Sequence, residues 1–246
     1  MNIFITGDTH GDLSRAIEMY DAITAENKLK GIPHVDKFDY LIHCGDYKKD
    51  GFDLGQALGL PVIAVYGNCD DVWDPDFDIL DTDAGSIVVT HGHVEDINTT
   101  HDHLYELAED QGCNCICYGH SHIAEYEEEN GYLLINPGSL TKPLDGTEGS
   151  VAILRADENG YAGNLIWYSD VIKAEQAARE EEPASAEAPA TVEEPEPQAE
   201  EPAPVEEPKP QTEEPEAESK APAPAKKKSS GLGGFLRKIF NYSDGQ

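Results

Sequence analysis

The chain has 246 residues, of which 49 are acidic and 17 are Lys or Arg, so its formal net charge is −32. A chain this acidic is not expected to bind extended nucleic acid, because neutralising phosphate groups requires clustered Lys and Arg. It contains no apolar run of about 18 residues that could span a membrane as a helix, and its start, MNIFITGDTHG, has neither the basic nor the apolar region of a signal peptide.

Composition divides the chain into three regions. Residues 1–173 hold all nine His and all five Cys, and their number suits one globular domain. Residues 174–225 hold 11 of the 16 Pro, many Glu and no aromatic residue, which predicts a disordered, extended acidic linker. Residues 226–246 reverse the charge and form a short basic segment. The five Cys follow no regular spacing, so we expect a reducing compartment, the cytoplasm.

The first region begins as an alternation of strands and helices. Short apolar or β-branched runs predict strands at 1–6, 40–44, 62–66, 87–90 and 114–118, and helical spacing predicts helices at 13–30 and 99–110. From about residue 122 the pattern changes to strands joined by turns, at 123–127, 132–136, 151–156 and 165–168. This order predicts a layered α/β domain with a central pair of sheets.

Polar loops follow five of these strands and read GDTHG, GD, GNCD, THGH and GHSH. Because ligand sites in α/β sheets form at the carboxyl ends of strands, we expect these loops to meet at one edge. They would bring together carboxylate, imidazole and amide groups, from Asp8, His10, Asp46, Asn68, His91, His120 and His122. Such a mixed set suits first-row ions such as Mn, Fe, Ni or Zn better than Ca or Mg. Each motif alone is a weak signal, but the ordered set predicts a metal centre.

With Asn136-Pro137-Gly138-Ser139 added, this ordered series resembles the calcineurin-like metallophosphoesterases, and more narrowly their small single-domain phosphodiesterase branch. The resemblance covers about residues 1–170. It implies a four-layer α/β/β/α sandwich, to which the composition adds a disordered C-terminal extension. It also implies two metal ions, one held by Asp8, His10 and His122. The other would be held by Asn68, His91 and His120, with Asp46 bridging both.

The resemblance implies a dinuclear phosphoesterase that needs two divalent transition-metal ions, with Mn expected first and Fe, Ni or Zn as alternatives. A hydroxide bridging the ions would attack phosphorus in line with the leaving oxygen. The positive charge would then come from metal rather than from Lys or Arg, so an acidic domain can accept an anionic ester. We expect a small phosphodiester as substrate; cyclic nucleotides, other nucleotide diesters and lipid-derived diesters all remain open.

The acid that protonates the leaving group is also open. Larger relatives carry His at the position of Cys69, whereas the narrower branch also has Cys there. Cys69, Asp70 and His93 are therefore the catalytic candidates beside Asp46, and His93 and Asp70 could equally be structural. We expect an enzyme that prefers good leaving groups.

A non-catalytic scaffold on the same fold, of the kind used in membrane-trafficking coats and recruited through the C-terminal tail, is the alternative function. All seven ligand positions carry competent residues, which favours the enzyme. We interpret Cys113, Cys115 and Cys117 as small buried side chains on one face of a strand, and His43 as a satisfied core or edge histidine. The sequence leaves the oligomeric state open.

The basic segment 226–246 carries one apolar stripe at helical spacing, formed by Leu232, Phe235, Leu236, Ile239 and Phe240. With its Lys and Arg, this stripe predicts an amphipathic segment that binds an anionic membrane surface, which would place the protein at the inner face of the membrane. A partner protein, an intramolecular contact or no specific role are the alternatives, since Gly231, Gly233 and Gly234 weaken a helix there.

Overall fold

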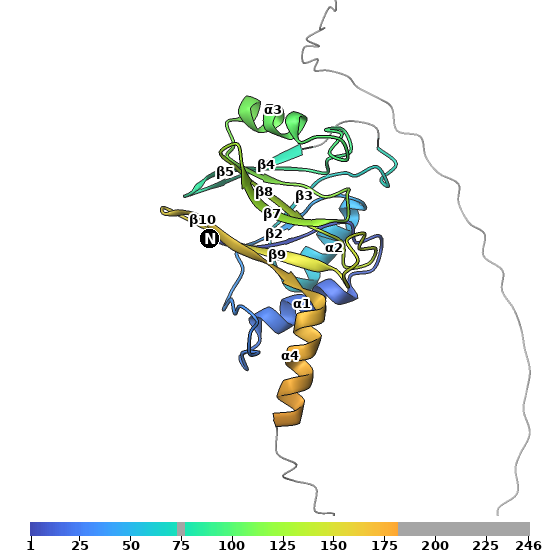
Figure 1. Cartoon of the computed structure of the whole chain (residues 1–246), viewed down its shortest axis with the longest axis vertical. Coiled ribbons are helices and arrows are strands. Elements are labelled where there is room, and N and C mark those ends of the chain that lie inside the picture. The colour runs from blue at the N-terminus through green and yellow to red at the C-terminus, as the bar shows by residue number, and fades with distance from the viewer. Residues whose placement is uncertain (73–76, 182–246) are drawn as a thin grey trace, which may run out of the picture. The chain divides into compact units, whose positions relative to one another are not determined.

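The computed structural model describes residues 1–72 and 77–181, and two five-stranded sheets form its centre (Figure 1). The first sheet has the order β10-β9-β1-β2-β3 and the second β4-β5-β6-β8-β7. The first contains β1 (Asn2–Thr6), β2 (Tyr40–His43), β3 (Val62–Ala64), β9 (Ser150–Asp157) and β10 (Gly160–Trp167). The second contains β4 (Phe77–Thr82), β5 (Gly85–Thr90), β6 (Cys115–Cys117), β7 (Ala124–Glu129) and β8 (Tyr132–Pro137).

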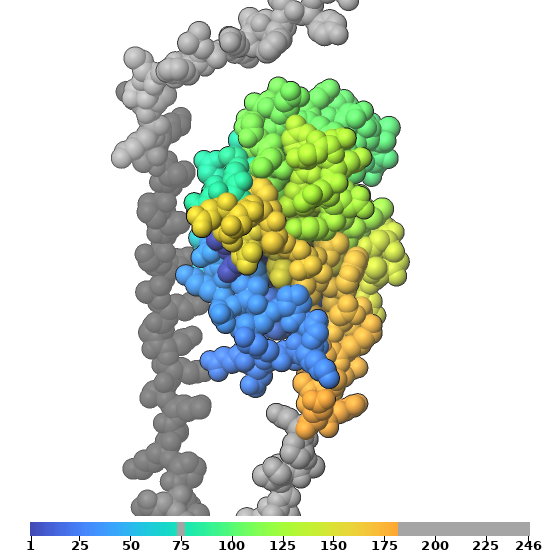
Figure 2. Space-filling view, turned by 60° about the vertical axis from the view of Figure 1, so that its left-hand side comes forward, coloured from blue at the N-terminus to red at the C-terminus, as the bar shows by residue number. Residues whose placement is uncertain are grey.

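Helices cover the outer faces of both sheets. The cluster on the outer face of the first sheet includes residues of α1 (Ser14–Thr24), α2 (Lys48–Leu58) and α4 (Tyr168–Glu181). The cluster on the second sheet includes residues of α3 (Asp102–Gln111). In Figure 2 the green residues of the second-sheet half lie next to the blue and orange residues of the first-sheet half. The predicted four-layer α/β/β/α sandwich is therefore confirmed. None of the helices in the described ranges is long and apolar enough to cross a membrane.

Strand alternation sorts the side chains between the layers. Ile3 and Ile5 of β1 pack into the core between the sheets, while Phe4 between them faces the helix layer. Cys115 and Cys117 also face the inter-sheet core, as predicted for small buried side chains. Cys113 does not share that face, because it precedes β6 and packs with α3.

The register of the parallel strands places the ligand-bearing loops together. β1 pairs in parallel with β2, and β2 with β3, so the carboxyl ends of these three strands lie at one edge. In the second sheet β5 and β6 are also parallel. Every loop that carries a predicted metal ligand follows one of these five strands.

Four elements differ from the sequence expectation. The helix predicted over 13–30 ends at Thr24, and α2 and β4 were not predicted at all. The two glycines of α2 made its sequence resemble a loop, yet packing requires them: a Cβ at Gly51 would lie 2.8 Å from the His43 Cβ, and one at Gly55 2.0 Å from a Val62 methyl. Helix α4, also unpredicted, continues past residue 173 to Glu181. The rest of the predicted linker, from residue 182, and the basic segment 226–246 lie outside the described residues.

Candidate metal centre

The structure brings all seven predicted ligands together at one edge of the sandwich. Asp8 and His10 follow β1, Asp46 follows β2, and Asn68 follows β3. From the second sheet, His91 follows β5, and His120 and His122 follow β6. Asp8 and His91 are fully buried, whereas Asn68 is exposed, so the cluster reaches the solvent on the Asn68 side.

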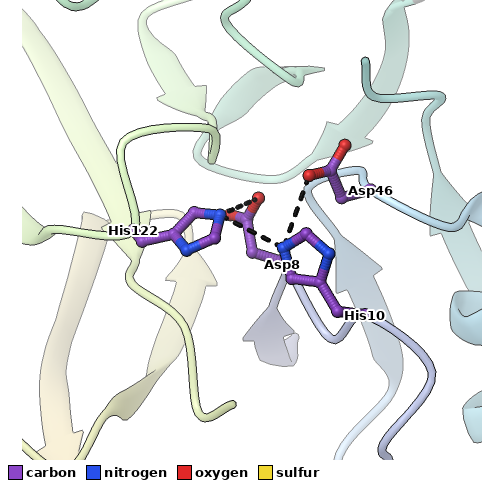
Figure 3. Close-up of side chains that lie close together, drawn as sticks. All are labelled: Asp8, His10, Asp46 and His122. Atoms are coloured by element: carbon purple, nitrogen blue, oxygen red, sulfur yellow. Dashed lines mark hydrogen bonds and ion pairs between the residues drawn. The ribbon is translucent and has the colours of Figure 1, made fainter. Parts of the chain in front are cut away.

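A first group is formed by Asp8, His10, Asp46 and His122, and Figure 3 shows the two imidazole rings meeting between the two carboxylates. One ligand atom from each residue lies within 4.8 Å of all the others. The two Nε2 atoms of His10 and His122 are 3.2 Å apart. His122 Nε2 lies 3.3 Å from Asp8 Oδ1, and His10 Nε2 lies 3.5 Å from Asp46 Oδ2.

A second group converges on the Asn68 amide oxygen. Its Oδ1 lies 2.9 Å from His120 Nδ1 and 3.1 Å from His91 Nε2. His91 Nε2 in turn lies 3.3 Å from Asp46 Oδ1. Asp46 therefore directs one carboxylate oxygen toward each group, which is the geometry expected of a bridging ligand.

The donor atoms fit divalent metal ions. Asp8 Oδ1 is buried and accepts no hydrogen bond within the described part of the chain. Two imidazole nitrogens cannot face each other at 3.2 Å through their lone pairs, so a proton or a cation must lie between His10 and His122. Donors about 2.1 Å from a shared first-row ion lie about 3 to 3.5 Å from one another, which matches both groups. The mixture of nitrogen and oxygen atoms favours the same ions.

The backbone of the cluster is strained. Five of the seven ligands have a positive φ, at 49° in Asp8, 48° in His10, 52° in Asp46, 67° in His120 and 55° in His122. Each such non-glycine conformation costs about 1–3 kcal/mol and persists only where the surroundings enforce it. This concentration of strain marks the edge as a functional site.

Two glycines let neighbouring loops approach the ligand carboxylates. A Cβ at Gly67 would lie 2.3 Å from Asp46 Oδ1, and one at Gly119 would lie 2.6 Å from Asp8 Oδ2. Any larger residue at either position would displace the carboxylate or the loop.

The pKa shifts of His10, His120 and Asp46 suit cation binding, whereas the shift of His122 favours the protonated ring. Burial lowers the pKa of His10 and of His120, which favours neutral rings that offer a lone pair. The close contact with the Asp8 carboxylate raises the pKa of His122. Burial alone would raise the pKa of Asp46. The contacts with His91, the Cys69 backbone N–H and His10 outweigh burial, so the pKa is lowered and this carboxylate is ionised.

The three candidates for the leaving-group acid differ in their surroundings. The Asp70 carboxylate accepts backbone N–H bonds from Tyr47, Lys48 and Gly67, at 3.0, 3.0 and 2.8 Å. It thereby joins the loops that carry Asp46 and Asn68, which favours a structural role. The Cys69 side chain is exposed, but partial loss of solvent around the thiol and the contact with Asp46 raise its pKa to about 11.

His93 lies beside the second group. Its ring centroid is 5.2 Å from that of His91, and burial lowers its pKa. Its Nδ1 is buried and has no hydrogen-bond partner among the described residues. His93 therefore lies beside the centre, and no structural hydrogen bond from the described residues occupies its Nδ1.

The end of β8 and the loop after it also hold the ligand loops in place. Ser139 Oγ donates to the Asp8 backbone oxygen at 2.9 Å, and the Asn136 amide donates to the Gly119 oxygen at 2.9 Å. His122 Nδ1 lies 2.7 Å from the Lys142 backbone oxygen. Residues 136–139 were already part of the motif series in the sequence, whereas Lys142 was not predicted, and its only signal was its position three residues after Ser139.

Comparison with known proteins agrees with this geometry. The profile of the calcineurin-like phosphoesterase superfamily domain matches residues 1–159. A probable metallophosphoesterase of Bacillus subtilis, YsnB, is 37% identical over 163 residues, which cover 65% of this chain and 86% of YsnB. The phosphodiesterase MJ0936 of Methanocaldococcus jannaschii is 28% identical over 178 residues, covering 65% of this chain and 96% of MJ0936.

Solved structures share the fold. A predicted phosphoesterase from Streptococcus pneumoniae superposes with a TM-score of 0.54 at 26% identity, over 68% of this chain and 90% of the other. Vps29 from Entamoeba histolytica, solved with zinc, superposes with a TM-score of 0.51 at 16% identity, over 68% of this chain and 99% of Vps29, and shows the fold alone. Together with the clustered ligands, the match over residues 1–159 shows that the chain belongs to the calcineurin-like phosphoesterase superfamily.

Proposed function

We propose that this protein is a metal-dependent phosphodiesterase that hydrolyses a small phosphodiester at a dinuclear centre. The observation that carries the proposal is the position of Asp46, whose two oxygens face two separate groups of donor atoms. MJ0936, which matches over nearly its whole length, is named a phosphodiesterase and supports a diester as the substrate.

In this proposal each group of side chains holds one ion. Asp8, His10 and His122 hold the first, Asn68, His91 and His120 hold the second, and Asp46 contributes an oxygen to each. Two such ions supply a hydroxide near neutral pH and offset negative charge on phosphoryl oxygens. Donors that mix nitrogen and oxygen suit divalent first-row ions, and among these we expect Mn first, with Fe, Ni or Zn as alternatives.

The chain's own residues orient the ester. The Lys142 side chain is exposed, while its backbone is fixed by the contacts with His122 and Ser139. Its ammonium group can bind a non-bridging phosphate oxygen at the edge of the first group. The strongly acidic composition of the rest of the domain disfavours a nucleic-acid strand, which leaves a small diester as the substrate.

Proton transfer to the leaving oxygen is assigned to His93 or Cys69. Asp70 is the weakest of the three candidates, because its carboxylate is occupied by three backbone N–H groups. A scaffold that only binds partners would have no need for seven competent ligands, five of them held in strained conformations, so the enzyme is the better explanation.

The test combines a substrate panel with one substitution. Protein reconstituted with Mn²⁺ should hydrolyse aryl and nucleotide phosphodiesters, and Asp46→Asn should abolish this activity and lower the bound metal, because it removes the shared carboxylate. Asp36→Asn, at an exposed position, is the matched control and should change neither. Full activity with two ions retained in Asp46→Asn would contradict the assignment.

A further inference from the structure

Three side chains outside the proposed ligand set form a continuous chain of hydrogen bonds behind the first group. Thr9 Oγ1 lies 2.8 Å from Asp50 Oδ2 and 3.0 Å from His43 Nε2. Asp50 Oδ2 also accepts the backbone N–H of Gly11 at 2.7 Å. Thr9 and His43 are buried, and Asp50 belongs to the first turn of α2.

The direction of these bonds follows from the single proton of the Thr9 hydroxyl. Thr9 donates that proton to the Asp50 carboxylate, so its oxygen must accept the bond from His43. His43 therefore carries its proton on Nε2. Its Nδ1 is buried and finds no partner in the described ranges, so His43 is only half satisfied.

The position of Thr9 gives this chain of bonds its importance. Thr9 lies between Asp8 and His10, and both neighbours have a positive φ. A loop strained on both sides needs contacts from outside to keep its shape. Asp50 supplies them on both sides of His10, through the Thr9 hydroxyl and the Gly11 N–H.

The same helix turn is fixed to the other ligand loops. Asp46 lies two residues before α2, and Asp70 accepts the N–H groups of Tyr47 and Lys48 at the start of the helix. Gly51 lets this turn lie against His43, since a Cβ there would be 2.8 Å from the His43 Cβ. The first turn of α2 thus joins the loops that carry Asp8, His10 and Asp46.

We propose that Thr9, His43 and Asp50 are positioning residues that hold Asp8 and His10 in the conformation that binds a metal ion. This inference rests on the proposed function, because it assigns a task only if the first group holds an ion. It predicts that losing the Thr9 hydroxyl lowers the affinity for a metal ion by more than its effect on the free energy of unfolding would explain.

The experiment measures Mn²⁺ binding by isothermal titration to the metal-free full chain. In Thr9→Val, which keeps the shape but removes the hydroxyl, we expect one of the two ions to bind about 10–100-fold more weakly, the usual effect of losing such a supporting contact. Thr9→Ser restores the hydroxyl and should bind both ions nearly as the original protein does. Val171→Ala, in the helix layer, serves as a control for loss of stability, measured for every variant by denaturant unfolding in EDTA.

The outcomes are distinguishable. A wild-type chain that binds no Mn²⁺ would overturn the proposed function itself. A wild-type chain that binds two ions, with Thr9→Val binding both equally well, would overturn only the positioning role. The same conclusion would follow if Val171→Ala lost as much affinity as Thr9→Val at equal stability. Should Thr9→Val fail to fold, Asp50→Asn at a half-exposed position decides by the same titration, with weaker binding expected.

Discussion

Gly67 lies against Asp46 so closely that a Cβ on Gly67 would be 2.3 Å from the Asp46 Oδ1 atom and 2.4 Å from its backbone nitrogen. Gly67 has no positive φ, so its conformation is open to other residues and only the space is missing. Because Gly67 has no side chain, the loop that carries Asn68 can lie in contact with the loop that carries Asp46.

This contact predicts the effect of Gly67→Ala. The added methyl group must push Asp46 away from one of the two donor groups, so we expect metal affinity to fall about tenfold or more, with activity falling in parallel. The measurement is Mn²⁺ titration of the metal-free protein. Gly59→Ala is the control: Gly59 has a positive φ of 69° and open space around it, so the variant loses about 1–2 kcal/mol of stability but keeps its metal affinity. Equal metal binding by Gly67→Ala and the wild type would contradict the steric argument.

The buried His43 side chain should make the stability of the fold depend on pH. Burial lowers the pKa of His43 from its ordinary 6.5 to about 4 in the folded protein. As the pH falls below 6.5, the unfolded chain takes up a proton that the folded protein refuses until about pH 4. The free energy of unfolding therefore decreases through this window, by about 3 kcal/mol from this residue.

The measurement for His43 is chemical denaturation of the metal-free protein across that pH range. His10, His93 and His120 also have lowered pKa values, caused mainly by burial, and add to the same slope. The comparison with His43→Gln isolates His43, because Gln keeps an N–H near Thr9 but does not titrate. The variant should be less stable at neutral pH and lose less stability on acidification. Parallel curves for the two proteins would refute the assignment to His43.

The ligands could be predicted from the sequence because they follow parallel strands, and the register of such strands fixes where their ends lie. Asp8, Asp46 and Asn68 needed no knowledge of side-chain packing to be placed at one edge. The supporting residues depend on contacts that sequence spacing does not encode. Asp50 became relevant only because α2 exists, and α2 was not predicted because Gly51 and Gly55 interrupt its sequence, although both pack against the sheet.

Asp70 and His43 show the same limit at the level of single side chains. Asp70 lies next to a ligand loop, so its proximity suggested chemistry, but the structure uses its carboxylate to accept three backbone N–H bonds. His43 was interpreted as a satisfied core or edge histidine, but within residues 1–72 and 77–181 only its Nε2 has a partner. In both cases the role depends on which groups the side chain contacts, and the pattern of strands in the sequence does not determine those contacts.

Replacing Lys142 should weaken substrate binding without changing the amount of bound metal. Burial is the main cause of the lowered pKa of His10, and the positive charge of Lys142 adds to it, so that charge acts on the first group. Lys142→Met should raise KM for a phosphodiester about tenfold, the value of one charge-assisted bond, while the bound metal stays unchanged. Lys142→Arg should recover part of the loss. Lys173→Met, on α4 beside Asp170, is the matched control, and an unchanged KM in Lys142→Met would remove Lys142 from the substrate site.

The leaving-group acid can be identified from rates on a series of diesters with different leaving groups. A proton donor matters most when the leaving oxygen is strongly basic, so its loss should slow alkyl diesters far more than nitrophenyl diesters. We expect His93→Gln to show this selective loss, by about 10²-fold or more on alkyl diesters. Cys69→Ala is the comparison at the neighbouring position. A uniform rate loss in His93→Gln, with a selective one in Cys69→Ala, would transfer the role to the thiol.

The basic segment 226–246 lies outside the described residues, and its predicted membrane contact is tested by liposome flotation. Each Lys or Arg near an anionic surface contributes about 1 kcal/mol, so binding should be measurable at low salt and should weaken as salt screens the charges. We expect the full chain to float with anionic liposomes and to remain unbound with zwitterionic ones, whereas a chain ending at Ala225 should float with neither. Leu236→Glu, which places a charge in the apolar stripe, should abolish flotation while leaving the basic residues in place. If the full chain and the truncated chain behave alike, the segment does not bind membranes, and a protein partner becomes the better explanation for its charge.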